Sequence, residues 1–196
     1  AAFRATPAVV FPPSELRNVA GAGPLEEVSF DLSGGFWVKR GDVHNTCNHD
    51  VVFARDWADV EAIRKDFARR EISQMLLQQH IDGDLIKFYG VGPGQWFTWF
   101  YHDPETARRL SFELEALACA AATAAGAVKL EVFGGDAIVA PNGKLYVIDI
   151  NSWPSFARVR AEAARQIARL LAAKLHTSPC ILSEGIAPSS THGKVP

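Results

Sequence analysis

The sequence predicts an α+β protein with antiparallel sheets. Its segments follow a mixed order of strands, helix, paired strands, helix, hairpin and helix, whereas a doubly wound parallel sheet alternates strand and helix. Asn142-Gly143, between two strand-like runs, is a dipeptide favoured in hairpin turns. Hydrophobic residues make up 48% of the 196 residues and charged residues 21%, which is typical of a globular chain.

Charge and composition disfavour several classes of protein. The 20 basic and 22 acidic residues leave a net charge of -2, which disfavours a protein that coats nucleic acid. No apolar run reaches the roughly 18 residues of a membrane span, and no secretory signal is visible. The three cysteines are far apart and lack CxxC spacing, which disfavours a disulfide framework and a zinc cluster. We therefore expect a cytoplasmic protein.

The first part of the chain predicts a connection followed by the elements of a small sheet. Residues 1–35 are rich in proline and glycine and predict a connecting segment with one short strand at Val9–Phe11. Asp56 is a good N-cap, and the apolar residues after it recur with helical spacing as far as Arg69. Strands are predicted at Phe36–Lys39, Asp50–Phe53 and Ile72–Gln79.

The second part predicts two long helices and several strands. Asp103-Pro104-Glu105 has the residues of a helix start, so we expect a helix from there to Ala125, ending at Gly126. Gly134-Gly135-Asp136 separates two short strands in this interpretation. The other predicted elements are strands at Leu85–Val91, Gln95–Tyr101, Lys129–Phe133, Ala137–Ala140 and Lys144–Ile150, a helix at Phe156–Lys174 and a flexible tail at 183–196.

Three oxygen-bearing side chains converge at the Asn-Gly hairpin. Asp149 and Asn151 are two residues apart on one strand and share a face, and Asp136 lies nearly opposite Asp149 on the partner strand. Two carboxylates and an amide suit Mg²⁺, which prefers hard oxygen ligands. Asp149 lies in an apolar strand, where we expect burial to make an unpaired carboxylate costly. The spacing leaves a second interpretation open, namely a capped strand end or a buried, hydrogen-bonded aspartate.

Two lysines are candidates for contacting phosphates. Lys39 ends an apolar strand and opens a polar loop, where Arg40 and loop N–H groups could act with it. Lys87 alternates with apolar residues and could face a cleft. Either lysine could instead be an ordinary surface residue. The backbone of the segment 76–83 offers N–H and C=O groups that could read an adenine edge.

No constellation for nucleophilic catalysis stands out. His44 and Cys47 share a loop, but their spacing is unspecific, and Ser155 lacks a G-x-S-x-G context. The sequence contains no P-loop and no G-x-G-x-x-G fingerprint that opens a helix. A single histidine such as His80 is more often structural than catalytic. We therefore assign no protein nucleophile.

Taken in order, these pieces resemble the ATP-grasp superfamily over about residues 36–175. Val38-Lys39 looks like its phosphate-contacting lysine, and the stretch from Gln78 to Gly83 looks like the hinge that holds adenine. Asp136 with Asp149-Ile150-Asn151 is similar to its magnesium signature. The stretch 83–92 resembles the matching strand of inositol trisphosphate 5/6-kinases, and ribosomal-protein glutamate ligases and glutathione-synthetase-like enzymes share the layout more loosely.

This resemblance implies a domain organisation and a set of cofactor-binding residues. Two α+β lobes, at 36–81 and 82–182, would enclose a nucleotide cleft, and residues 1–35 would lead from a further N-terminal domain. The implied cofactors are ATP and Mg²⁺, with Asp84 as a candidate for ribose contact. The implied nucleotide set is Lys39, Arg40, Gln78, Gln79, His80, Ile81, Asp84 and Lys87, and the metal set is Asp136, Asp149 and Asn151.

The resemblance also implies an activity. Members of the superfamily join a carboxylate to an amine, or less often a thiol, through an acylphosphate made from ATP. This step is phosphoryl transfer, which needs charge neutralisation and positioning rather than a protein nucleophile. Lys39 and Lys87 are then the catalytic residues, and the partners are small-molecule carboxylates and amines rather than nucleic acid or membrane.

Two other functions remain open at this point. A kinase of a phosphorylated polyol needs several cations around the cleft, which Arg40, Arg158 and Arg160 could provide. A non-catalytic nucleotide-binding module is the second alternative. A basic cleft would favour the kinase, and a neutral one with a small pocket near residues 153–156 would favour the ligase. The aromatic run Trp96–Tyr101 leaves a homodimer interface open.

Overall fold

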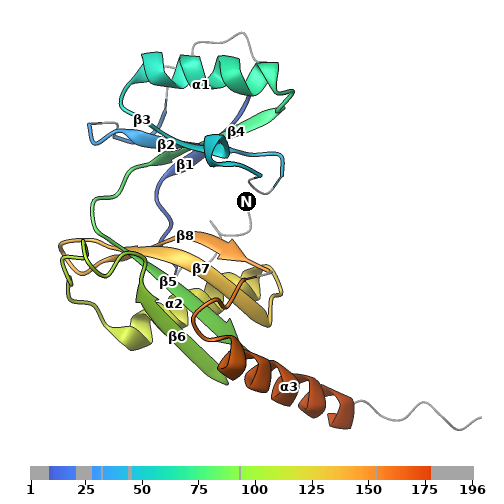
Figure 1. The fold of residues 1–196 in the computed structure, drawn as a ribbon. Helices are drawn as coiled ribbons and strands as arrows, with labels where there is room; N and C mark the ends of the chain where they lie inside the picture. The colour runs from blue at the N-terminus through green and yellow to red at the C-terminus, as the bar shows by residue number, and fades with distance from the viewer. Residues whose placement is uncertain are drawn as a thin grey trace, which may run out of the picture.

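The computed structural model describes residues 9–20, 28–31, 33–43, 46–92, 94–152 and 154–177. It consists of two lobes, each built on an antiparallel four-stranded sheet (Figure 1). The strand order is β1-β4-β2-β3 in the small lobe and β6-β5-β7-β8 in the large lobe. This architecture confirms the predicted α+β fold class with two antiparallel sheets. The tail predicted at 183–196 lies outside the described residues.

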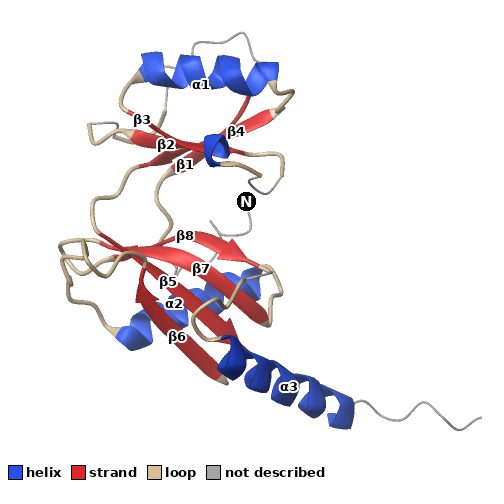
Figure 2. Cartoon of the chain, viewed as in Figure 1, coloured by secondary structure: helices blue, strands red, loops and turns tan. Residues whose placement is uncertain are grey.

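The small lobe carries one long helix on the outer face of its sheet (Figure 2). Its elements are β1 (Ser14–Asn18), β2 (Phe36–Arg40), the short 3-10 helix η2 (Asn48–Asp50), β3 (Val51–Ala54), α1 (Trp57–Arg69) and β4 (Gln74–Gln79). Asp56 caps α1 as predicted, because its carboxylate accepts a backbone N–H of the first turn at 2.9 Å. Phe36 and Val38 are buried in the core with residues of α1. Since side chains alternate along a strand, Trp37 and Lys39 face the large lobe.

The large lobe carries helices on both faces of its sheet. Its elements are β5 (Asp84–Val91), β6 (Trp96–Tyr101), α2 (Leu114–Ala127), β7 (Val132–Val139), β8 (Leu145–Asn151) and α3 (Arg160–Thr177). The alanine-rich α2 lies on the face turned away from the small lobe (Figure 1). On the other face, α3 covers one end, where Tyr89 and Val91 pack with Phe156 and Ala163. No helix in the described part of the chain is both long and apolar enough to cross a membrane.

A β-bulge in β8 decides which face Asp149 takes. Ala137 pairs with Val147 and Asp136 pairs with Asp149, so Ile148 is an extra residue in β8. Val147 is buried in the core beneath α2. Residues two apart on a regular strand share a face, so a regular β8 would turn Asp149 into that core. The extra residue turns Asp149 to the opposite face, where it is exposed.

In its described part, the chain crosses between the lobes at two places. Residues 80–83 join β4 to β5 at the predicted hinge. The second crossing precedes β1: Val9 is buried in the large-lobe core, and the carbonyl of Val10 accepts the N–H of Val147 at 2.9 Å. Beyond this crossing, β1 pairs with β4 in the small sheet. The expectation that residues 1–35 only connect is therefore wrong for their described part, and the small lobe begins before β2.

The second helix begins later than predicted. The carboxylate of Asp103 does accept a backbone N–H two residues on, at 3.1 Å, but this turn does not continue into α2. Instead, the buried carboxylate of Asp84 accepts the N–H groups of Arg108 at 2.8 Å and Leu110 at 2.7 Å. These bonds hold the segment before α2 in an irregular conformation, so a long-range contact overrides a local helix-start signal.

Two other predicted elements differ for packing reasons. β7 runs without interruption through Gly134-Gly135, where two strands were expected. A Cβ at Gly135 would lie 2.3 Å from the carbonyl oxygen of Asp149, so the glycine permits a close approach rather than a turn. The strand expected at Val9–Phe11 does not form, and the side chains of Val9 and Phe11 pack onto the large-lobe core. The polar segment after them forms the edge strand β1.

Candidate active site

One row of side chains crosses the large sheet on the face turned toward the small lobe. The strand register places Phe100 of β6, Lys87 of β5, Asp136 of β7 and Asp149 of β8 side by side. Lys87 Nζ donates to Asp136 Oδ1 at 2.7 Å. Asn151, two residues further along β8, donates its amide to Asp149 Oδ2 at 2.8 Å. The fold thus brings together the three predicted metal ligands and one of the two predicted phosphate-binding lysines.

The small lobe contributes Lys39 to the same place. Burial between the lobes lowers the pKa of the Lys39 ammonium group below its usual 10.5, whereas the charges of Asp149 and Asp136 raise it. Because both carboxylates act on Lys39, this lysine lies across from the two acidic metal-ligand candidates. Together with Lys87, the site contains two ammonium groups and two carboxylates, so its formal charges balance.

A pocket of about 340 Å³ opens beside this row. The Lys87–Asp136 pair lines one part of it. In the neighbouring row, the hydroxyl oxygens of Tyr89 and Ser155 are 3.4 Å apart. A Cβ at Gly134 would lie 2.6 Å from the ring of Pro154, so this wall of the pocket requires glycine. The lining residues are Lys87, Tyr89, Gly134, Gly135, Asp136, Asn151, Ser152, Pro154 and Ser155.

The segment that follows β8 is anchored by Phe156. This residue has a φ of 49°, in the left-handed region that bulky side chains rarely adopt. Its ring is buried, with the centroid 4.8 Å from that of Tyr89. Such strain persists only where the surrounding packing enforces it. The buried ring therefore fixes the backbone that presents Ser155 to the pocket.

The donor set fits a magnesium ion. Asp136 and Asp149 present carboxylates on one face, and rotation of the Asn151 amide would present its oxygen beside them. In the described residues, no three His, Cys, Asp or Glu side chains form a metal-binding group, and the candidate set here consists of two carboxylates and an amide. The expected burial of Asp149 is wrong: the carboxylate is exposed, so desolvation provides no argument for the site.

Three residues predicted to bind the nucleotide are engaged elsewhere. Arg40 Nε donates to Asp42 at 2.6 Å in the loop after β2. The buried Gln78 donates its amide to Ser14 Oγ at 3.1 Å, next to the second crossing. Asp84 holds the segment before α2, as described above. These contacts give the three side chains structural roles, and we remove them from the candidate nucleotide set.

The predicted hinge residues Gln79, His80 and Ile81 lie between the lobes and are partly buried. His80 Nδ1 accepts the indole N–H of Trp37 at 3.3 Å, and its ring centroid is 5.4 Å from that of Phe53. His80 therefore has a structural contact, in line with its interpretation from the sequence. The three rings form an aromatic surface beside the hinge, which suits a planar base.

Sequence reasoning missed the aromatic residues on both sides of the site. Trp37 precedes Lys39 by two residues, and Tyr89 follows Lys87 by two residues. Side chains two apart on a strand share a face. Because Lys39 and Lys87 were already assigned to the site, this alternation of side chains would have predicted that the rings of Trp37 and Tyr89 face it too. The role of Phe156, in contrast, depends on a backbone conformation that no sequence pattern indicates.

Comparisons with known proteins identify the fold. Neither protein families nor curated protein sequences give a match to this chain. The D-alanine–D-alanine ligase from Coxiella burnetii is similar in structure, with a TM-score of 0.61 and 14% identity over 89% of this chain and 55% of that one. The ATP complex of the Bacillus anthracis D-alanine–D-alanine ligase also has a TM-score of 0.61, with 16% identity over 86% of this chain and 60% of that one.

A third similar structure is an ADP complex of N5-carboxyaminoimidazole ribonucleotide synthetase. Its TM-score is 0.55, with 16% identity over 78% of this chain and 43% of that one. The chain therefore spans little more than half the length of these two ligases and less than half the length of the synthetase. All three are ATP-grasp enzymes. The two facing lobes, their sheet orders and these likenesses together show that the chain has the ATP-grasp fold.

Proposed function

We propose that this chain carries the nucleotide site of an ATP- and Mg²⁺-dependent ligase that joins a carboxylate to an amine or a thiol. The row of Lys87, Asp136 and Asp149, faced by Lys39, supports this proposal because it combines metal ligands with cations for phosphate oxygens. The likeness to ATP-grasp ligases supports it at the level of the fold.

Each residue has a defined task in the proposed reaction. Asp136, Asp149 and Asn151 would hold Mg²⁺, which, when bound, neutralises charge on the phosphates. Lys39 and Lys87 would place ammonium groups beside the oxygens of the transferred phosphoryl group. A carboxylate oxygen of the substrate attacks the γ-phosphorus, and the bond to the bridging oxygen of ADP breaks. The amine then attacks the acyl carbon, inorganic phosphate leaves, and the nitrogen loses a proton.

The charge balance of the pocket is the observation that favours a ligase over a kinase. Among the described residues, the charged ones that line it are Lys87 and Asp136, which are paired with each other. A polyanionic acceptor would need several free cations. Arg40 is bound to Asp42, and Arg158 and Arg160 do not line the pocket. The described lining of the pocket therefore offers no cluster of free cations for an acceptor with several phosphates.

Thermal unfolding with and without MgATP tests the nucleotide site. At free MgATP about 100 times its dissociation constant, the expected stabilisation is roughly 2.7 kcal/mol. Asp149→Ala should fold, since the side chain is exposed, and should lose this stabilisation. Glu115→Ala, an exposed substitution on α2 behind the sheet, is the control and should keep it. Stabilisation retained in Asp149→Ala would refute the metal assignment, and none in the wild type would refute the nucleotide site.

Trapping with hydroxylamine tests the acylphosphate. Hydroxylamine attacks an acylphosphate to give a hydroxamate and phosphate, whereas a phosphorylated polyol gives none. We expect MgATP-dependent hydroxamate from at least one member of a panel of mono- and dicarboxylates, with equimolar ADP. Lys39→Ala should abolish this product. ADP formation with an inositol phosphate and no hydroxamate from any carboxylate would favour the kinase instead.

A further inference from the structure

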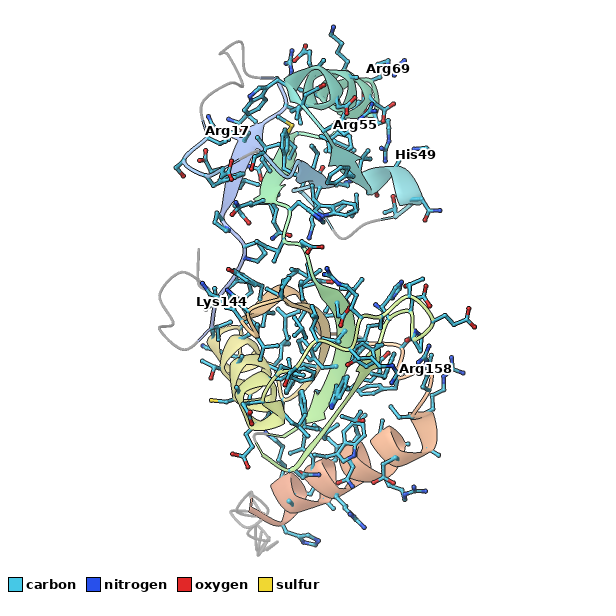
Figure 3. The ribbon with its side chains drawn as sticks, turned by 90° about the vertical axis from the view of Figure 1, so that its left-hand side faces the viewer. Arg17, His49, Arg55, Arg69, Lys144 and Arg158 are labelled. Carbon is cyan, nitrogen blue, oxygen red and sulfur yellow. The ribbon has the colours of Figure 1, made fainter. Side chains whose placement is uncertain are left out.

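One cation stands at the end of the site row without a role in the proposed reaction. The guanidinium carbon of Arg158 lies 4.4 Å from the ring centroid of Phe100. Phe100 is the register partner of Lys87 and is the β6 member of the row that continues to Asp136 and Asp149. Figure 3 shows Arg158 and Lys144 at opposite sides of the large lobe. The arginine therefore flanks the row at the end away from Asp149.

Arg158 differs from most arginines of the chain in its partners. Arg40, Arg64, Arg70 and Arg108, for example, each form an ion pair with a carboxylate. Within the described residues, no ion pair to Arg158 is found, and its charged group is exposed above the aromatic ring. A guanidinium that stacks on a ring by its face keeps its edge N–H groups available for an oxyanion.

The backbone holds Arg158 in place. It lies in the turn between Phe156, whose buried ring is fixed against Tyr89, and Val159, whose N–H donates to the carbonyl of Phe156 at 2.8 Å. The same short segment brings Ser155 to the pocket. Arg158 is therefore placed by the structure that shapes the pocket, rather than by a free loop.

The spacing of the row separates this cation from the metal ligands. Neighbouring strands are about 4.8 Å apart, so the Phe100 position lies roughly 5 Å from Lys87 and roughly 10 Å from Asp136. A carboxylate that reacts beside Lys87 would leave Arg158 within reach of a group several bonds away on the same molecule. Lys87 is paired with Asp136, whereas Arg158 forms no ion pair within the described residues and is available to bind that group.

We propose that Arg158 binds a second oxyanion of the carboxylate substrate, namely a further carboxylate or a phosphate, at a distance of roughly 5–10 Å from the reacting carboxylate. This inference rests on the proposed function and narrows it to substrates with at least two anionic groups. Arginine suits the task because its planar fork matches the two oxygens of a carboxylate or phosphate. One such cation serves a single extra anionic group, in agreement with the otherwise balanced pocket.

Three small acids test the proposal: butyrate, glutarate and phosphonobutyrate. They share a short chain, but glutarate adds a terminal carboxylate and phosphonobutyrate a terminal phosphonate. Their binding to the full chain would be measured by calorimetry, with and without MgADP. We expect at least one dianion to bind about 10- to 100-fold more tightly than butyrate, the range for one charge-assisted contact. The stronger of the two dianions identifies the class of the second oxyanion.

Variants distinguish a specific contact with the Arg158 guanidinium group from a general effect of positive charge on the binding of dianions. Arg158→Met keeps an apolar stem above Phe100 and should reduce dianion binding to the level of butyrate, whereas Arg158→Lys should recover part of it. Lys144→Met is the matched control, because Lys144 also stacks on a ring, that of Tyr146 at 4.9 Å, but at the other side of the lobe. This control should leave the preference for dianions unchanged.

The outcomes are distinguishable from those of the proposed function. Equal or undetectable binding of all three acids would overturn the role of Arg158, and so would a preference that survives in Arg158→Met. Stabilisation by MgATP should persist in Arg158→Met, since this residue is not in the nucleotide set. If MgATP did not stabilise the wild-type chain, the nucleotide site would be refuted. A preference for dianions over butyrate that depends on Arg158 would still support the anion site in that case.

Discussion

Asp136 and Asp149 are direct register partners across β7 and β8, one position beyond the bulge at Ile148. The bulge allows Val147 and Ile150 both to pack on the side of α2, although they are three residues apart. An odd spacing would put them on opposite faces of a regular strand. The acidic pair therefore depends on an irregularity in the strand as well as on the two side chains.

Gly135→Ala should disturb this acidic pair. The added Cβ would lie 2.3 Å from the carbonyl oxygen of Asp149, and a backbone atom cannot move aside without shifting the strand. We expect the stabilisation by MgATP to fall sharply, as measured by thermal unfolding. Gly126→Ala in α2 is the control, because its Cβ would meet nothing within 4 Å. That substitution should be neutral or stabilising by up to about 1 kcal/mol. Equal MgATP stabilisation in both variants would contradict the prediction.

Lys87→Met should strengthen metal binding in the absence of nucleotide. In the nucleotide-free chain, the Lys87 ammonium group occupies Asp136 Oδ1 at 2.7 Å and so competes with a cation for that oxygen. We expect Mn²⁺ to bind about tenfold more tightly to Lys87→Met, as measured by electron paramagnetic resonance, a gain of about 1.4 kcal/mol. The Mn²⁺–ATP complex should bind more weakly, since a phosphate-binding cation is lost. Unchanged Mn²⁺ affinity would show that Lys87 does not compete with a metal ion for Asp136.

The affinity for ATP should fall at a lower alkaline pH than it would if Lys39 had the pKa of an exposed lysine. Burial lowers the pKa of Lys39 from 10.5, so its ammonium group loses the proton sooner as the pH rises. The nucleotide-free protein should gain stability between that lowered pKa and 10.5, because there the unfolded chain binds more protons. Titrations of ATP affinity and of unfolding free energy against pH would show both trends. Lys39→Arg should remove them, because arginine stays charged.

Asp84→Ala should destabilise the chain without affecting nucleotide binding. The substitution leaves the backbone N–H groups of Arg108 and Leu110 without their acceptors, at a cost of about 1–3 kcal/mol for each group left buried and unpaired. Asp84→Asn keeps one acceptor oxygen and should cost less. Denaturant unfolding measures the loss, and the shift with MgATP should be the same in all three proteins. A selective loss of that shift would restore Asp84 to the nucleotide site.

Local signals in the sequence predicted much of the fold. Asp56 caps α1 because the cap and the helix are contiguous in the chain. The Asn142-Gly143 turn fixes the hairpin that brings Asp136 near Asp149, which is why their proximity could be predicted without a structure. Lys39 and Lys87 were found for a similar reason, since each ends or interrupts an apolar strand.

Long-range contacts explain what could not be predicted. Gln78 belongs to the predicted hinge by sequence, but its side-chain amide donates a hydrogen bond to the hydroxyl oxygen of Ser14, 64 residues earlier. In the sequence, Asp84 is an acidic residue beside the predicted hinge with no evident partner. Its carboxylate accepts backbone N–H groups of residues more than 20 positions later, and only the folded chain places those groups next to it. The bulge at Ile148 has no turn residue or proline to mark it. These features depend on which segments meet in space, and composition does not contain that information.

The second crossing makes the small lobe an insertion within the large one. The large-lobe core is assembled from Val9 and Phe11 together with the chain from β5 onward, and the elements from β1 to β4 between them form the small lobe. A fragment that starts at β5 would leave a void where Val9 packs and a Val147 N–H without its acceptor.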